Sequence, residues 1–177
     1  EEKDAHYQSV LNTRKRGVLR LDFTVDAADT SEEAEADAQF VRDFLDRDEL
    51  QDEVYDILDA VGKGISFSEI VWDHSERQWD IAEIVNCPQR WFEFDRIDGV
   101  TPRLIDEGNT RLDLDPYKYI VHAHKSKTGL PVRGGLVRPC AWMWLFKNFT
   151  FRDWAVFVDA YGQPIRIGKY DAGASAE

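Results

Sequence analysis

Two histidines one residue apart are the side chains whose spacing comes closest to a metal site. His122 and His124 flank Ala123, and alternate residues of a strand point to the same face of a sheet. Two imidazoles on one face can begin a zinc site, but zinc needs a third protein ligand. The sequence holds no H-x-x-x-H, H-E-x-x-H or C-x-x-C pattern that would supply one. We expect two structural histidines, and a metal-dependent enzyme using His122 and His124 stays open as an alternative.

No other pattern carries catalytic chemistry. Gly62-Lys63-Gly64 is too short for a phosphate-binding loop and is more typical of a helix end. Glu69 and Asp73 are the carboxylates that we expect to be partly buried, but nothing distinguishes them among 34 acids. Cys87 and Cys140 lack the spacing of a disulfide framework or metal motif, so two reduced thiols are expected. The sequence therefore favours a binding or assembly protein over an enzyme, with no cofactor and no bound metal.

Length and composition bound the class of protein. The chain has 177 residues, enough for one large domain or two small ones. Hydrophobic residues make up 43% and aromatic residues 12%, which is too much for a disordered chain. A formal net charge of -12 argues against a protein whose main task is to neutralise phosphates. No apolar run approaches the length of a membrane span, so we predict no membrane association.

The charge is unevenly placed along the sequence. Residues 22–60 hold fifteen acidic residues against Arg42 and Arg47, whereas residues 116–170 hold nine basic residues against Asp153 and Asp159. Both regions can simply be solvated surfaces. They can also be complementary patches that set contacts between copies, since opposite charges fix register and orientation. A third interpretation is an acidic surface that imitates DNA.

The N-terminal third has the periodicity and the capping residues of helices. We predict a helix over 4–20, a short strand over 22–27, and a second helix from a capping box formed by Thr30 and Glu33. A third helix starts from Asp48 and ends at Gly62 and Gly64, because glycine accepts the left-handed conformation.

The middle third reads as short strands joined by tight turns. Residues 65–72 and 78–85 are predicted to form a hairpin, and further strands are predicted over 91–95, 101–106 and 117–124. Helices kept apart from a meandering antiparallel sheet give an α+β fold.

The segment from Leu136 to Tyr161 is the most unusual part of the sequence. It predicts one helix of about 39 Å, with Pro139 in its first turn and Gly162 as a left-handed cap. Its apolar residues point in every direction, and a helix that is apolar all round must be surrounded. Part of it is therefore expected to meet another subunit, with a core formed entirely within the chain as the alternative.

Several phrases of the sequence occur together in one known family. They are Asp4-Ala5-His6, Asn12-Thr13-Arg14-Lys15-Arg16, Cys87-Pro88-Gln89-Arg90-Trp91-Phe92, Val121-His122, Gly134-Gly135-Leu136-Val137-Arg138-Pro139, Leu145-Phe146-Lys147-Asn148-Phe149, Asp153-Trp154-Ala155 and residues 161–170. In this order they resemble the portal proteins of Mu-like bacteriophages and prophages. Asp159 stands where the family has glutamate. The chain starts without Met and the family's proteins are longer at both ends, so we expect a fragment.

The resemblance implies a fold and an assembly. Residues 1–133 would form an α+β wing-like domain with a mostly antiparallel sheet and packed helices. Residues 134–161 would form a long stem-like helix, and residues 162–177 the entry to the clip and a frayed tail. The protein would be a structural subunit, and not an enzyme, in a homo-oligomeric ring of usually twelve copies.

The resemblance also implies partners and a place in the virion. The ring would sit at the procapsid vertex, after assembly in the bacterial host cytoplasm. Double-stranded DNA would pass through it non-specifically during packaging and ejection, driven by the terminase motor, and head and neck or tail proteins would dock on it. An acidic DNA-mimic inhibitor remains the alternative.

Two sets of helix residues are candidates for these contacts. The predicted subunit-interface residues are apolar: Trp142, Leu145, Phe146, Phe149, Trp154 and Phe157. The residues that could touch DNA phosphates in the channel are basic: Arg138, Lys147 and Arg152. These bases can instead cap helix carbonyls or pair with acids of a neighbouring copy.

Overall fold

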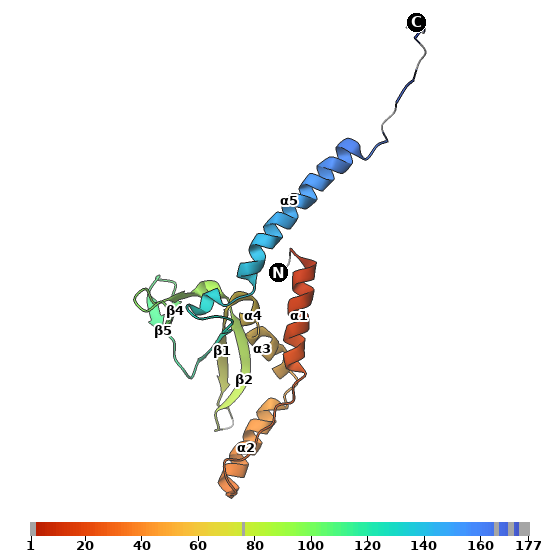
Figure 1. Cartoon of the computed structure of the whole chain (residues 1–177). Helices are drawn as coiled ribbons and strands as arrows, with labels where there is room; N and C mark the ends of the chain where they lie inside the picture. Colours follow the sequence, from red (N-terminus) through yellow and green to blue (C-terminus); the bar gives the residue numbers. More distant parts are fainter. Residues whose placement is uncertain (1–2, 76, 165–166, 170–171, 174–177) are drawn as a thin grey trace. The chain divides into compact units, whose positions relative to one another are not determined.

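A computed structural model describes residues 3–75, 77–164, 167–169 and 172–173, and divides the chain into two compact units, Glu1–Arg138 and Pro139–Glu177. Figure 1 labels the elements along the chain. The helices of the first unit are α1 (Ala5–Leu19), α2 (Glu32–Leu45), α3 (Leu50–Ile57) and α4 (Ala60–Lys63), with 3₁₀ turns at Gln89–Trp91 and Pro131–Arg133. Its strands are β1 (Ile65–Asp73), β2 (Asp80–Cys87), β3 (Phe92–Phe94), β4 (Pro102–Ile105), β5 (Arg111–Asp113) and β6 (Tyr119–Ala123). The predicted α+β class is confirmed.

The first sheet has the order β2-β1-β6, and all its pairings are antiparallel. The predicted hairpin of β1 and β2 is confirmed, with an irregularity in register between Val71 and Trp72. The prediction of one meandering sheet was wrong. The strands form two sheets, and β6 pairs with β1 in the first sheet and not with β5 in the second. The reason lies in β1, whose first four residues are buried. A strand with so many buried residues is best placed in the centre of a sheet, with a partner strand on each side.

The core lies between this sheet and the start of the second one. Phe67 on β1 is 2% exposed and stacks on Phe92 with a centroid distance of 3.9 Å. Tyr119 on β6 meets Phe92 edge-on, and Cys87 on β2 is buried in the same cluster. Burial is the main cause that raises the pKa of the Cys87 thiol. Aromatic pairs in these geometries contribute more stability than the area they bury would give. This cluster therefore joins the two sheets.

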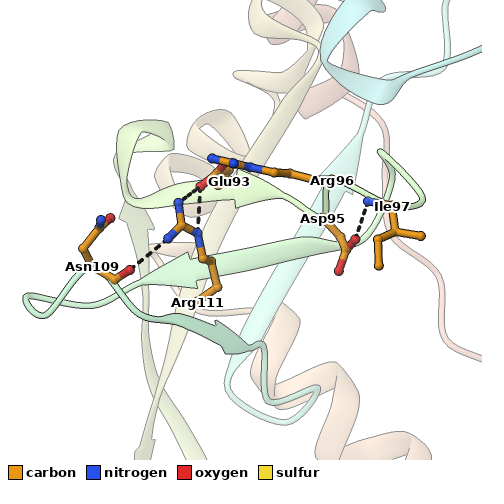
Figure 2. A network of polar contacts seen from close by, with 6 residues as sticks. All are labelled: Glu93, Asp95, Arg96, Ile97, Asn109 and Arg111. Carbon is orange, nitrogen blue, oxygen red and sulfur yellow. Dashed lines mark hydrogen bonds and ion pairs between the residues drawn. The ribbon is translucent and has the colours of Figure 1, made fainter.

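The second sheet, with the order β3-β4-β5, is held by a surface network of ion pairs (Figure 2). The guanidinium of Arg111 on β5 donates to the Glu93 carboxylate on β3 and to the carbonyl of Asn109. Hydrogen bonds from Arg111, and then from Arg96, lower the pKa of Glu93. In the β3–β4 turn, the Thr101 hydroxyl and nearby amides lower the pKa of Asp98 to about 2. The turns predicted at 98–99 and 107–109 are therefore present and held by carboxylates.

The helices depart from the predictions at their ends. The residue that caps α2 is Ser31, which accepts from the amide of Ala34, and not Thr30. The strand predicted over 22–27 is absent, because the carbonyl of Val25 is taken by the guanidinium of Arg42 and the segment has no partner strand. The third predicted helix is interrupted between α3 and α4, and the Asp48 side chain does not cap it, since Glu49 is its N-cap.

Two backbone segments approach closely at glycines, residues 61–64 at the end of α4 and residues 134–136 before the long C-terminal helix. Gly64 ends α4 with φ of 99°, in the left-handed region that the sequence predicted for it. Its carbonyl accepts from the amide of His124 at 2.9 Å, and the amide of Leu136 donates to the carbonyl of Val61 at 3.1 Å. A Cβ on Gly135 would lie 2.4 Å from the carbonyl oxygen of Gly62. The two backbones approach this closely only because glycine has no side chain.

The long helix is α5 (Val137–Tyr161), which confirms the predicted C-terminal helix. Pro139 lies in its first turn, where the absent amide costs no helical hydrogen bond. Gly162 donates its amide to the carbonyl of Val158, but it does not adopt the predicted left-handed conformation. The predicted clip-entry segment and tail, 162–177, include residues 165–166, 170–171 and 174–177, which lie outside the described residues.

We expect Gly135→Ala to lower the free energy of unfolding of the first unit by about 1–3 kcal/mol, because the added methyl group overpacks a backbone crossing. Urea unfolding followed by circular dichroism measures the change. Gly17→Ala in α1 is the matched control, since a Cβ there meets nothing within 4 Å. That control should be stabilising by up to about 1 kcal/mol, from helix propensity alone. Equal effects of the two substitutions would contradict the close crossing at Gly135.

Candidate subunit interface

Apolar side chains cover α5 on all sides, and none of its residues is buried. Trp142 is 64% exposed, Phe157 is 58% exposed and Tyr161 is 67% exposed. No helix or strand follows α5 among the described residues of the second unit, so this unit has no second element that could cover it. Single exposed apolar residues are ordinary, but a helix with exposed aromatic residues over more than half of its circumference is a mark of an interaction surface.

The six predicted interface residues all lie on α5. Trp142, Phe146, Phe149, Trp154 and Phe157 are exposed, and Leu145 is intermediate. At about 100° per residue, five of them lie on one side of the helix and Trp154 lies next to that side. Phe157 contacts Tyr161 one turn later, at a centroid distance of 5.3 Å. Both side chains stay more than half exposed despite this contact, so most of each ring is available to a partner.

The three predicted phosphate-contacting bases are also exposed on α5, but two of them lie against aromatic rings. The Lys147 ammonium is 5.8 Å from the centroid of Phe151, and the Arg152 guanidinium is 5.5 Å from that of Phe149. Arg152 also forms an exposed ion pair with Asp153 at 3.4 Å. Exposed pairs of this kind contribute little to stability, so the side chains can exchange partners.

One histidine of the pair, His122, has a structural contact. Nδ1 of His122 lies 2.9 Å from the carbonyl oxygen of Ile57, which links β6 to the end of α3. Within the described part of the chain, no three His, Cys, Asp or Glu side chains gather where they could hold a metal. Of the two carboxylates expected to be partly buried, Glu69 is intermediate and pairs with Lys118 at 3.0 Å. Asp73 is exposed and accepts from Ser75, so that expectation was wrong for Asp73.

The buried carboxylate that the sequence analysis missed is Glu53 on α3, with 6% of its side chain exposed. One of its oxygens accepts from the amide of Ile84 at 2.9 Å, and the other accepts from Arg47 at 2.7 Å. Arg47 also donates to the carbonyls of Ile81 and Ala82, so this pair satisfies the outer edge of β2. The signal was present in the sequence, because Glu53 lies three residues after Leu50 and thus on the apolar face of its helix.

A second buried charge joins α1 to the α3–α4 region. Lys15 is 4% exposed, donates to Asp59 at 3.2 Å and lies 4.6 Å from the ring centroid of Tyr55. Asp59 also pairs with Lys63 at 2.5 Å. Burial is the largest cause that raises the pKa of the neighbouring Asp56 carboxyl. Two acids of the segment 22–60, Glu53 and Asp59, are therefore paired with cations inside the first unit, whereas the other thirteen lie at exposed positions.

A family model described as the portal protein of Mu bacteriophage matches residues 1–177. The chain belongs to this portal protein family. It is 33% identical over 177 residues to the portal protein of Escherichia phage Mu, covering 99% of this chain and 35% of that relative. It is also 33% identical over 180 residues to Mu-like prophage FluMu protein gp29 of Haemophilus influenzae, covering 99% of this chain and 34% of the relative. The chain thus spans about a third of the length of these curated relatives.

Membership in the portal family confirms the resemblance drawn from the sequence phrases. It agrees with the α+β fold and the long C-terminal helix of the structure. Among the described helices, none combines the length and the apolarity that a bilayer crossing requires. The family therefore supplies the context in which the exposed surface of α5 is interpreted.

We expect Glu53→Ala to lower the free energy of unfolding by about 3 kcal/mol, because it leaves the Arg47 guanidinium and the Ile84 amide without their buried partner. Glu35→Ala is the matched control: Glu35 accepts from Arg42 at 2.7 Å, but 62% of its side chain is exposed. That substitution should cost less than about 1 kcal/mol. Urea titrations of both variants measure the difference, and a loss at Glu53 no larger than at Glu35 would refute the edge-capping role.

Proposed function

We propose that the chain is part of a structural subunit of a phage portal ring, through which double-stranded DNA is packaged into the procapsid and later ejected. The observation that carries this proposal is α5, a helix of 25 residues without a buried residue in a chain of the portal family. An apolar surface of this size is stabilised when a partner covers it. A ring of identical subunits provides such a partner for every copy.

The parts of the chain take the roles that the family resemblance implies. In this proposal residues 1–133 form the wing, residues 134–161 a stem element and residues 162–177 the entry to the clip. The whole ring would hold about twelve copies and would sit at the procapsid vertex of a virion assembled in the host cytoplasm. The terminase motor would dock on it during packaging, and neck or tail proteins afterwards.

The proposed role is structural and not enzymatic. The described residues hold no cluster of metal ligands, and the carboxylates singled out from the sequence are engaged in ion pairing or exposed hydrogen bonding. Within the described part of the chain, His122 and His124 have no third side chain beside them that could complete a metal site.

The proposed contact with DNA is weak and transient. Every phosphate that a protein neutralises adds affinity through counterion release, and a conduit that held DNA tightly would stall its passage. Arg138, Lys147 and Arg152 are the only Lys or Arg residues of α5. In a net acidic subunit this number of bases is compatible with sliding.

The oligomeric state of the full-length protein tests the proposed ring. Its mass in solution should correspond to many copies, and negative-stain images should show closed rings. We expect Trp142→Ala to weaken assembly without changing the unfolding of the first unit, since Trp142 is 64% exposed. Trp79→Ala, at the end of the β1–β2 hairpin, is the matched control, because Trp79 is also 64% exposed. Single copies of the unaltered protein at every concentration would refute the ring.

The salt dependence of DNA binding tests the proposed channel contacts. Replacement of Arg138, Lys147 and Arg152 by Ala should lower the slope of log K against log salt by at most about 1 for each base. Fluorescence anisotropy with labelled duplex DNA and assembled particles measures the slope. The matched control replaces three exposed bases of α1 and its C-cap, Arg14, Arg16 and Arg20. An equal loss with that control would contradict a specific role for α5.

The acidic segment supports the DNA-mimic inhibitor as the second candidate. Most of its fifteen acids lie at exposed positions of α2, α3 and their connections. This function requires tight binding to a basic DNA-binding protein in competition with DNA. A protein that forms rings and does not compete with DNA for such a target would exclude it.

A further inference from the structure

Sixteen residues of α5, all exposed except the intermediate Leu145, sort into three faces when they are placed at about 100° per residue, and Met143, Thr150 and Tyr161 lie between the first two faces. The first, face A, lies around 160° from Val137 and consists of Trp142, Phe146, Phe149, Asp153 and Phe157. The second, face B, lies around 300° and consists of Trp144, Lys147, Phe151, Trp154 and Val158. The third, the polar stripe, lies around 40° and consists of Ala141, Leu145, Asn148, Arg152, Ala155 and Asp159.

Faces A and B are both aromatic, but they differ in charge. Face A carries an acid, Asp153, whereas face B carries a base, Lys147. The polar stripe separates them on one side and holds small or polar residues in five of its six positions. Two different apolar faces on one helix suit a contact in which unlike surfaces meet, because a two-fold contact uses the same surface twice and leaves the other face bare.

We propose that face A of one copy packs against face B of the next copy, and that the polar stripe stays uncovered. The inference rests on the proposed ring and deepens it by naming the two surfaces that meet. The opposite charges of Asp153 and Lys147 favour this pairing over A with A or B with B, where like charges would face each other. Repetition of one A–B contact around a rotation axis closes a ring.

The area of the two faces agrees with an interface core. The aromatic side chains on face A are between 46% and 64% exposed, and those on face B between 37% and 63%. A fully exposed aromatic residue offers about 150–250 Å², so one A–B junction would bury on the order of 600 Å² from aromatic residues alone. A standard interface buries about 1,600 Å² in total. Helix α5 thus supplies the apolar centre of the contact, and other surfaces of the subunits complete it.

This arrangement separates two of the bases predicted to touch DNA. Arg152 lies on the polar stripe, where it can face a phosphate once it leaves its exposed ion pair with Asp153 and its contact with the Phe149 ring, both of which belong to face A. Lys147 lies on face B beside Phe151, at 5.8 Å from the ring centroid, and would be enclosed in the junction. The same geometry therefore assigns Lys147 to assembly and Arg152 to the open surface.

A mixing experiment with the full-length protein tests the pairing of unlike faces. Phe149→Glu blocks face A, Phe151→Glu blocks face B, and Ala155→Glu places the same charge on the polar stripe as a control. All three positions are exposed in the single chain, so folding should be unaffected, and urea unfolding checks this. Each blocked variant alone should stay a single copy, because its remaining face finds no intact complement. The two variants mixed in equal amounts should form a dimer containing one of each, and the control should form rings.

Mass measurement of the separately tagged variants decides the outcome, at a concentration at which the unaltered protein is fully in rings. Dimers formed by either blocked variant alone would show that like faces meet and would overturn the inference. So would rings formed by either variant, an equimolar mixture without mixed dimers, or loss of rings in the Ala155→Glu control. An unaltered protein that forms no multi-copy assembly would instead refute the proposed function itself.

Discussion

The constraint on which the structure depends is that one helix cannot by itself bury an apolar surface that covers more than half of its circumference. Each square ångström of apolar surface left in water costs about 25 cal/mol, and α5 presents aromatic rings on every side except its polar stripe. A helix in a globular domain avoids this cost by turning one stripe to the core and a polar face to water. The pattern of α5 fits a helix with neighbours on more than one side, as in a closed ring of identical subunits.

The first unit differs from α5, because it folds around a core of its own and pairs its most buried charged groups. Phe67 and Phe92 join its two sheets, and Glu53 with Arg47 covers the outer edge of β2. Exposed edges of sheets invite further strands, and natural proteins commonly cover them. This unit therefore provides a folded body whose last segment, at Gly135 and Leu136, is fixed by backbone contacts before α5 continues.

What the sequence could predict followed from strong local patterns. The apolar run bounded by Pro139 and Gly162 marked α5, and Gly64 marked the end of α4. Features that depend on partners far away in the sequence could not be predicted in this way. They are the pairing of β6 with β1, the hydrogen bond from Arg42 to Val25 in place of a strand, and the burial of Glu53. The assembly surface was predicted as a set of residues, but its division into faces needs the helical phase of every side chain. That phase is fixed only once the helix is known to be continuous.

The uneven charge of the chain is consistent with the same proposal. Both bases of the acidic segment are engaged inside the first unit, Arg42 with Glu35 and the carbonyl of Val25, and Arg47 with Glu53. The remaining carboxylates therefore give a surface that repels phosphate, whereas the few bases of α5 offer it only scattered contacts. For a proposed conduit, attraction has to be strong enough to admit DNA and weak enough to release it at each step. A chain that is acidic overall and carries single bases, with Arg152 as the one base on the polar stripe of α5, fits both conditions without any base-specific contact.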